Sequence, residues 1–234
     1  MKAVIMAAGK GTRMLPVTQT IPKVLIPVGN KPFLHHLIKN IHQAGIKDIA
    51  IITSYKSEMV EQFLNEYDIK ATIIDQGIPE GTGHAISKVN QFTNNENFLA
   101  FAGDNLWSTF DIRQMIQHDD LTYVAAFKVQ DPSKYGVLVT KDDKLVEIKE
   151  KPEEFVGDTI NSSLYKFTPQ VFEELKNITK SKRGEYEITD ALTSLAKKNQ
   201  VKVYTIQDYW MDLGSLEDIP NVDNFLQSLQ TPDQ

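Results

Sequence analysis

The stretch that decides the fold is AVIMAAGKGTRMLPVTQTIPKVLIP, residues 3–27. It opens with a short apolar run over residues 3–6, which is typical of a buried β-strand. A loop with Gly9 and Gly11 follows the run. Because glycine has no side chain, backbone N–H groups in such a loop can approach an anion closely. The glycines alone are also compatible with an ordinary tight turn between a strand and a helix.

Two cations follow the glycines. Arg13 stands directly after Thr12, and Lys23 stands directly after Pro22. A guanidinium group offers a planar fork to phosphate oxygens, whereas an ammonium group acts as a compact point charge. A strand, a glycine loop and two cations in this order predict a phosphate-binding site.

Two common phosphate-binding motifs are excluded. The nicotinamide fingerprint G-x-G-x-x-G requires a third glycine where Met14 stands. The P-loop requires lysine after its second glycine, but Gly11 is followed by Thr-Arg.

What remains is G-x-G-T-R-x-x-P over residues 9–16 and P-K-x-L-x-P-V over residues 22–28. Together they resemble the signature of the sugar-1-phosphate nucleotidyltransferases. A match at this many positions, each with a chance of roughly one in twenty, seldom arises by coincidence. The resemblance runs from residue 1 to about 215 and is densest before residue 30. From this sequence we expect no C-terminal β-helix domain of the kind found in some relatives.

The composition excludes several classes of protein. The chain has 234 residues, a net charge of −6 and no cysteine. An acidic chain is not expected to bind nucleic acid, and without cysteine it has no disulfide, no thiolate catalysis and no Cys-based zinc site. No apolar run approaches the roughly 18 residues of a membrane span. We therefore expect no membrane partner and a cytoplasmic location.

The first 130 residues alternate between strand and helix patterns. Apolar runs predict strands at 3–6, 49–53, 71–75, 98–104 and 121–129, and helical spacing predicts helices at 33–44, 59–64, 83–92 and 112–116. This alternation predicts an α/β fold, a Rossmann-like and mostly parallel twisted sheet with helices on both faces.

The second half has shorter and more polar strand patterns. They predict a small mixed β region with strands at 135–140, 144–150, 159–167 and 201–206, a helix at 188–199, and a closing helix from Ser215 to near Leu229. We expect one domain over residues 1–230, with a nucleotide-binding half (1–130) and a sugar-phosphate-binding half that includes the closing helix (131–230). The tail 231–234 is expected to fray.

Two aspartates are candidate metal ligands. Asp104 follows the run at 98–102, and ligands of open α/β sheets lie beyond the carboxyl ends of the strands. If that run neighbours the first strand, Asp104 faces the phosphates, which requires a cation between them and makes it a candidate Mg²⁺ ligand. Asp212 lies in WMDLGS, which resembles a family segment whose aspartate shares the metal. A turn-forming role for Asp104 and a helix-capping role for Asp212 are the structural alternatives.

The segment QGIPEGTGHA, residues 76–85, is a candidate base-binding segment. Gln76 can present a donor and an acceptor to a base edge, which suits uracil or thymine. The resemblance assigns Gln76 and Gly81 to the pyrimidine, and Thr82 offers a hydroxyl at a helix start. We interpret the lone His84 as structural.

The resemblance supplies the remaining site residues. It implies that the nucleotide-binding loop comprises Ala8, Gly9, Gly11 and Thr12. It also implies that the Gly136 backbone, Glu150 and Asn161 bind sugar hydroxyls and that Lys151 meets the sugar phosphate. From the residues alone, Glu150 and Lys151 would be interpreted as a solvated strand end.

The implied reaction transfers a nucleotidyl group from UTP or dTTP to glucose-1-phosphate or N-acetylglucosamine-1-phosphate and releases pyrophosphate. The attacking oxygen is already anionic, so catalysis needs positioning and charge neutralisation rather than a general base. Arg13 would stabilise the leaving group and Lys23 the α-phosphate, Mg²⁺ on Asp104 and Asp212 would offset charge, and Lys151 would orient the nucleophile.

Two other functions stay open. A non-catalytic regulatory protein that binds nucleotide sugars would be expected to lack Arg13, Lys23 or an aspartate, and all are present. A CTP-dependent enzyme resembling phosphocholine cytidylyltransferases is disfavoured by Gln76 and by the sugar-site segments. The resemblance is compatible with a homo-oligomer.

Overall fold

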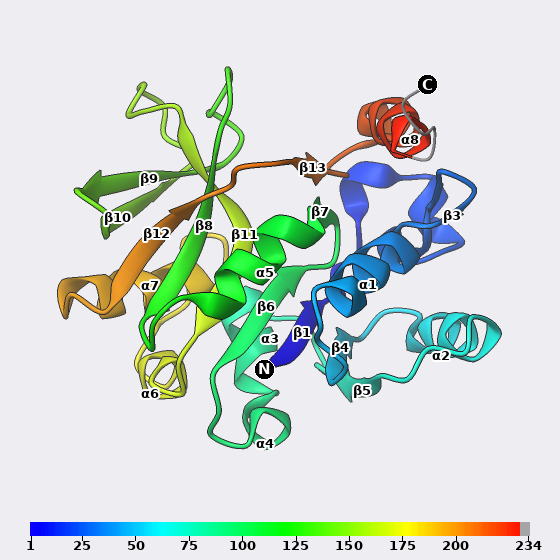
Figure 1. The fold of residues 1–234 in the computed structure, drawn as a ribbon, viewed down its shortest axis with the longest axis horizontal. Coiled ribbons are helices and arrows are strands. Elements are labelled where there is room, and N and C mark those ends of the chain that lie inside the picture. The colour runs from blue at the N-terminus through cyan, green and yellow to red at the C-terminus, as the bar shows by residue number, and fades with distance from the viewer. Residues whose placement is uncertain (230–234) are drawn as a thin grey trace.

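The computed structural model describes residues 1–229 and builds them around a nine-stranded sheet (Figure 1). From edge to edge the strands are β5 (Thr72–Asp75), β4 (Ile49–Thr53), β1 (Lys2–Met6), β6 (Phe98–Ala102), β11 (Thr159–Phe167), β8 (Thr122–Lys128), β12 (Val201–Thr205), β10 (Lys144–Glu150) and β9 (Gly136–Lys141). Two small sheets pair β2 (Pro27–Val28) with β3 (Lys31–Pro32) and β7 (Asn105–Trp107) with β13 (Trp210–Asp212).

Strand β1 is the centre of a parallel group. Ala3 pairs with Ile49 of β4 and with Leu99 of β6, and both pairings are parallel. Strands such as β4 and β6 are buried on both faces, so their sequences are continuously apolar and do not alternate between apolar and polar residues. The expected neighbourhood of β1 and β6 is confirmed. The carboxyl ends of β5, β4, β1 and β6 therefore meet at one edge of the sheet.

The second half of the chain joins the same sheet. β11 lies antiparallel between β6 and β8, with Leu164 opposite Phe101 and Asn161 opposite Ala126. The predicted α/β fold is confirmed, but parallel order is limited to β5–β4–β1–β6 and to β8–β12. The sequence predicts that the second-half strands lie beside a parallel sheet, whereas β11 is inserted between β6 and β8 of the first half. Pairing between segments so far apart in sequence has no local signal.

Helices cover both faces, as predicted. Neighbouring residues of β1 point to opposite faces, so Ile5 belongs to one apolar cluster and Val4 to the other. The first cluster contains residues of α1 (Phe33–Gln43), α2 (Ser57–Glu66), α5 (Thr109–Gln117) and α8 (Ile219–Ser228). The second lies under α3 (Thr82–Ser87), α4 (Asn90–Thr93), α6 (Val171–Leu175) and α7 (Ile188–Lys197).

Three local expectations differ from the structure. The helix expected over 83–92 is divided into α3 and α4, and the short helix α6 had no clear pattern. Ser215 does cap a helical segment, but it caps the 3₁₀ turn η4 (Leu216–Asp218) through a capping box with Asp218, and α8 begins only at Ile219. The tail 231–234 lies outside the described residues. Within residues 1–229, no helix is both long and apolar enough to cross a membrane.

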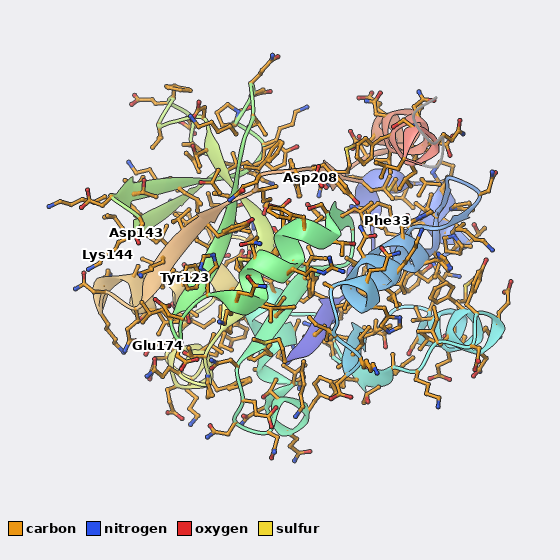
Figure 2. The ribbon with its side chains drawn as sticks, in the orientation of Figure 1. Phe33, Tyr123, Asp143, Lys144, Glu174 and Asp208 are labelled. Atoms are coloured by element: carbon orange, nitrogen blue, oxygen red, sulfur yellow. The ribbon has the colours of Figure 1, made fainter. Side chains whose placement is uncertain are left out.

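The buried side chain of Asp111 fastens α5 to the segment that leads into β13. Its carboxyl group accepts hydrogen bonds from the hydroxyls of Ser108 and Tyr204, at 2.6 and 2.7 Å. It also accepts from the backbone N–H groups of Gln207 and Asp208, at 2.8 and 3.1 Å. Asp208 is labelled beside this connection in Figure 2. One carboxyl group thus fixes the approach of β13 to the site described below.

We expect Asp111→Ala to lower the free energy of unfolding by about 3 kcal/mol, because several buried donors lose their acceptor at once. Urea denaturation of the purified protein measures the change. The control is Asp143→Ala, which removes an exposed carboxylate and should change stability by no more than about 0.5 kcal/mol. Equal stability of the two variants would contradict a fastening role for Asp111.

Candidate active site

The glycine loop after β1 contains two glycines with different surroundings. Gly11 has a φ of +63°, and a Cβ there would lie 2.8 Å from Cγ2 of Thr18, so the turn itself requires glycine. A Cβ at Gly9 would meet no atom within 4 Å. Gly9 is exposed, next to the buried Ala8. The space beside Gly9 is open at the carboxyl end of β1, where a phosphate group could approach the backbone.

Lys23 and Asp104 form an ion pair at the same edge. Lys23 begins the 3₁₀ turn η3 (Lys23–Leu25), and its Nζ lies 2.6 Å from Oδ2 of Asp104. Gly103 brings the aspartate close to β1: its N–H donates to the carbonyl of Met6 at 2.9 Å, and a Cβ there would lie 2.8 Å from that oxygen. The lysine ammonium is only slightly exposed, so it is a buried counter-ion for Asp104.

Asp212 reaches the site because β13 pairs with β7. Asp212 stands opposite Asn105 in that pair, and the N–H of Leu213 donates to the Asp104 carbonyl at 2.9 Å. The Asn105 amide nitrogen donates to Oδ1 of Asp104 at 3.0 Å and to Oδ1 of Asp212 at 3.3 Å. The two aspartates, 108 positions apart in the sequence (212 − 104), therefore share one hydrogen-bond donor.

The two carboxyl groups have opposite pKa shifts. Burial, followed by the negative charge of Asp104, raises the pKa of Asp212 to about 6. Burial would also raise the pKa of Asp104, but the ammonium group of Lys23 more than offsets it and lowers that pKa. Two adjacent carboxylates with one counter-ion leave an excess of negative charge.

This donor set fits a hard divalent cation. Carboxylate oxygens are the ligands that Mg²⁺ prefers, and protein Mg²⁺ sites commonly use one or two carboxylates together with substrate phosphates. Over residues 1–229 there is no group of three or more His, Cys, Asp or Glu side chains placed to hold a metal. A cation here would have to complete its coordination with water and with a ligand's phosphates.

Arg13 and Tyr135 face the same carboxylates. Arg13 is exposed in the 3₁₀ turn η1 (Thr12–Met14), and its charge lowers the pKa of both Asp212 and Tyr135. Burial and the nearby Asp212 carboxylate nevertheless raise the pKa of Tyr135 to about 12. The Tyr135 ring packs edge-on against Trp210 at 5.7 Å. A guanidinium that has no ion-pair partner among residues 1–229 and a neutral phenol thus act on the carboxylate pair.

Gln76 follows β5 and lies at the same edge of the sheet. Its backbone N–H donates to the carbonyl of Thr53 at the end of β4, at 2.8 Å. Its amide nitrogen donates to the Gly81 carbonyl at 3.0 Å and lies 3.3 Å from Nδ1 of His84. Burial lowers the pKa of His84, so the neutral ring can accept the second N–H. The Gln76 oxygen then remains to accept an N–H from a base, and a donor for the base must come from elsewhere.

Gly81 and Thr82 are tied to the start of α7. Gly81 has a φ of +107°, and a Cβ there would lie 2.5 Å from the carbonyl oxygen of Tyr186. The Thr82 hydroxyl accepts a hydrogen bond from the N–H of Ile188, the first residue of α7, at 3.0 Å. Both residues therefore have structural reasons for their identity, and their assignment to the nucleotide stays a prediction.

The four residues expected to bind the sugar phosphate lie together. Gly136 of β9 stands opposite Glu150 of β10. A Cβ at Gly136 would lie 3.0 Å from Oε2 of Glu150 and 3.9 Å from Cβ of Asn161. The N–H of Lys151 donates to the carbonyl of Tyr135 at 3.0 Å, which links this group to the carboxylate pair.

The Asn161 side chain is already hydrogen-bonded within the protein. Its amide nitrogen donates to the Tyr165 hydroxyl at 2.8 Å, and its oxygen accepts from the N–H of Ser163 at 2.9 Å. These bonds hold the irregular part of β11, where the register shifts between Asn161 and Tyr165. Binding of a sugar hydroxyl by Asn161 stays a prediction.

Sequence reasoning missed three residues of this site: Asn105, Tyr135 and Trp210. Asn105 and Tyr135 are each adjacent in sequence to a predicted residue, in GDN and YGVL, and Trp210 stands two positions before Asp212 in WMDLGS. Trp210 contacts Asn105 and Tyr135 because β13 pairs with β7. No local sequence pattern predicts that pairing.

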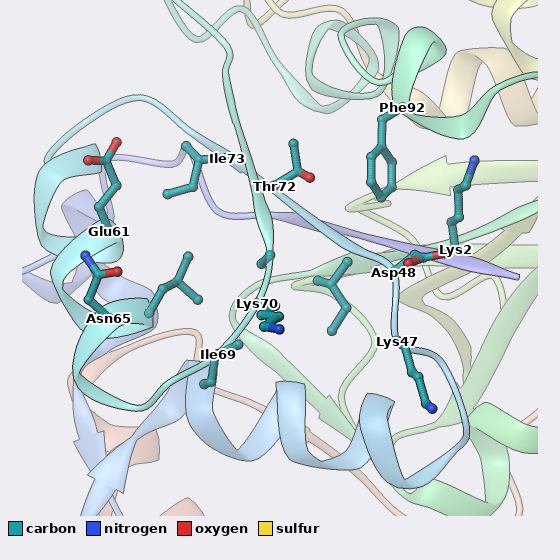
Figure 3. Close-up of a pocket in the computed structure, with 13 residues that line it drawn as sticks. Lys2, Lys47, Asp48, Glu61, Asn65, Ile69, Lys70, Thr72, Ile73 and Phe92 are labelled. Carbon is teal, nitrogen blue, oxygen red and sulfur yellow. The ribbon is translucent and has the colours of Figure 1, made fainter.

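A hollow of about 710 Å³ lies at the other end of the parallel strands, near their amino ends (Figure 3). Its lining includes Lys2, Asp48 and Thr72, which lie at the amino ends of β1, β4 and β5. Ligands of open α/β sheets bind at the carboxyl ends. We therefore place the candidate active site at the carboxylate pair and not in this hollow.

Comparison with known proteins agrees with this geometry. The model of the family described as nucleotidyl transferase matches residues 2–228. The chain belongs to this family. Within the family, it is 33% identical over 233 residues to the bifunctional protein GlmU of Methanococcus aeolicus, covering 99% of this chain and 56% of that protein.

Two further relatives are informative. A bifunctional sugar-1-phosphate nucleotidylyltransferase/acetyltransferase of Sulfurisphaera tokodaii is 36% identical, over 96% of this chain and 55% of that protein. A crystal structure described as a putative glucose-1-phosphate thymidylyltransferase from Bacillus anthracis, in complex with a sucrose, has a TM-score of 0.88 and 28% identity, covering 100% of this chain and 98% of that one. This nucleotidyl transferase chain spans about half the length of the two curated relatives.

Proposed function

We propose that this chain transfers a nucleotidyl group from UTP or dTTP to a sugar-1-phosphate, either glucose-1-phosphate or N-acetylglucosamine-1-phosphate. The observation that carries the proposal is the half-buried pair of Asp104 and Asp212 beside the open glycine loop, with Lys23 paired to Asp104. The names of the sugar-1-phosphate nucleotidylyltransferase and thymidylyltransferase relatives support it.

In this reaction an oxygen of the sugar-1-phosphate forms a bond to the α-phosphorus of the nucleotide. The bond from that phosphorus to the oxygen bridging to the β-phosphate breaks, and pyrophosphate leaves with the electron pair. Arg13 neutralises the leaving pyrophosphate, and Lys23 contacts the α-phosphate. Lys151 orients the attacking phosphate, so the protein contributes positioning and charge rather than proton transfer.

Lys23 has to exchange partners for this role. In the present structure its ammonium group is held by Asp104, so contact with a phosphate requires another positive charge on the aspartates. We propose that Asp104 and Asp212 hold Mg²⁺, which when bound neutralises phosphate charge. The excess negative charge of the carboxylate pair supports this assignment.

The test is pyrophosphate release by the purified chain with Mg²⁺, across a matrix of nucleoside triphosphates and sugar-1-phosphates. We expect turnover with UTP or dTTP and one of the two sugars. CTP with phosphocholine is included as a separate arm, and Asp104→Asn is the inactive control. Turnover in the CTP arm alone would replace the sugar assignment, and no turnover with any pair would favour a regulatory binding protein.

A further inference from the structure

We propose that Asn105 is a positioning residue that presents Asp104 and Asp212 to a divalent cation, and that Trp210 sets the orientation of its amide. The proposal rests on the proposed function, because it concerns the same carboxylate pair. It adds two residues that act through other side chains, and a physical reason why the two carboxylates are already arranged when a cation arrives.

The orientation of the Asn105 amide is determined by its neighbours. An asparagine side chain can be turned so that its oxygen and nitrogen exchange places. The indole N–H of Trp210 is a donor only, and its Nε1 lies 2.7 Å from Oδ1 of Asn105. The oxygen must therefore face the indole. The NH₂ group then faces the aspartates, and its two hydrogens match its two carboxylate partners.

This orientation matters because the two aspartates repel one another. Each has one oxygen, Oδ1, held by the same amide nitrogen. The other oxygen of Asp104 is held by Lys23, which a phosphate ligand would draw away. Two carboxylates fixed close together with the same donor do not have to be brought together by the cation. A preorganised pair of this kind binds a cation more tightly than a mobile pair.

Removing the indole N–H takes away the donor that anchors the Asn105 oxygen. In Trp210→Phe the amide is held by the two carboxylates alone, so it moves with them and no longer fixes their separation. Loss of a group that orients metal ligands typically weakens metal binding by about 10- to 100-fold. We expect an effect near the lower end of this range, because Trp210 acts on the aspartates through Asn105.

The chain contains its own matched control. Its two tryptophans stand opposite each other in the β7–β13 pair. Both are buried, at 0% exposure for Trp107 and 9% for Trp210. Trp107 donates its indole N–H to the Ser162 hydroxyl at 3.2 Å instead of to Asn105. Trp107→Phe therefore removes the same atoms from the same small sheet without freeing the amide.

The experiment is a Mn²⁺ titration of the metal-free protein, with free Mn²⁺ measured by electron paramagnetic resonance. Mn²⁺ alone is the probe, so the result does not depend on knowing the substrate. We expect the Kd of Trp210→Phe to rise at least about tenfold over wild type, and that of Trp107→Phe to stay within twofold. Thermal unfolding of both variants shows whether they lose similar stability.

A double-mutant cycle separates positioning from packing. Asn105→Ala should weaken Mn²⁺ binding as much as Trp210→Phe does or more. In the Asn105→Ala background, Trp210→Phe should have no further effect on the Kd, because the indole acts only through that amide. Additive effects, or equal weakening by Trp107→Phe, would overturn the positioning role.

The reference variant is Asp212→Asn, which defines binding at the carboxylate pair. If wild type and Asp212→Asn bind Mn²⁺ equally, the proposed metal site fails, and the positioning role fails with it. If wild type binds more tightly than Asp212→Asn but Trp210→Phe matches wild type, only the positioning role fails. The two failures are therefore distinguishable.

Discussion

Lys23→Ala is expected to lose turnover by on the order of 10³-fold, as is typical when a preorganised positive charge is removed from a developing anion. Lys23 is the buried cation at the glycine loop, and no other lysine or arginine forms an ion pair with Asp104 in residues 1–229. Single-turnover measurement with the active substrate pair separates loss of chemistry from loss of binding. Near wild-type turnover would exclude Lys23 from the mechanism.

The same change should also lower stability, which distinguishes Lys23 from Arg13. In Lys23→Ala, Asp104 becomes a half-buried carboxylate that has lost its counter-ion and lies beside a second carboxylate, and the expected cost is about 1–3 kcal/mol. Arg13 is exposed, so Arg13→Ala should reduce turnover with little change in unfolding. Lys141→Ala removes an exposed lysine far along β9 and should change neither quantity.

Asp212→Asn is expected to abolish most turnover and yet to stabilise the metal-free protein. The ionised Asp212 is destabilising there, because burial and the Asp104 charge oppose it and raise its pKa from 3.8 to about 6. That rise corresponds to at most about 3 kcal/mol of unfolding free energy at neutral pH. Functional sites commonly carry such a cost in stability.

The sign of the pH dependence follows from the raised pKa. Above pH 6 the Asp212 carboxyl group is ionised in both states, and the folded state bears the full penalty. As the pH falls from about 6 to 3.8 the folded protein takes up the proton first, so the penalty disappears. The stability difference between Asp212→Asn and wild type should therefore be largest above pH 6 and approach zero near pH 4.

Urea unfolding of both proteins across this pH range, without divalent cations, measures the difference. Comparing the two proteins cancels the titration of the groups whose charges do not act on Asp212, the histidines among them. Added Mn²⁺ should stabilise wild type and have less effect on Asp212→Asn, since a ligand stabilises only the state that binds it. A variant less stable than wild type at pH 7.5 would contradict the repulsion described above.

Much of the site could be predicted because its residues follow strands. Asp104 was expected at the carboxyl end of a strand next to β1, and the pairing of Ala3 with Leu99 confirms that arrangement. The proximity of Gly136, Glu150, Lys151 and Asn161 came only from the family resemblance. Glu150 and Lys151 alone are indistinguishable from a solvated strand end.

Other features could not be predicted from local patterns. The insertion of β11 between β6 and β8 depends on pairing between segments more than 30 residues apart, and a strand's sequence does not name its partner. The commitment of Gln76 to the Gly81 carbonyl and of Thr82 to α7 was also unforeseen. The bond of Thr82 depends on the position of α7, which begins 106 residues further along the chain.

The sequence by itself determined the glycine loop, the alternation of strands and helices, and the position of Asp104 after a strand. These depend on residue type and short spacing, which local chemistry governs. Only the tertiary structure decided that Asp104 and Asp212 share the amide of Asn105, that Trp210 orients this amide, and that Lys23 neutralises only one of the two. The physical reason is that charge repulsion, burial and hydrogen-bond direction depend on distances that exist only once distant strands have paired.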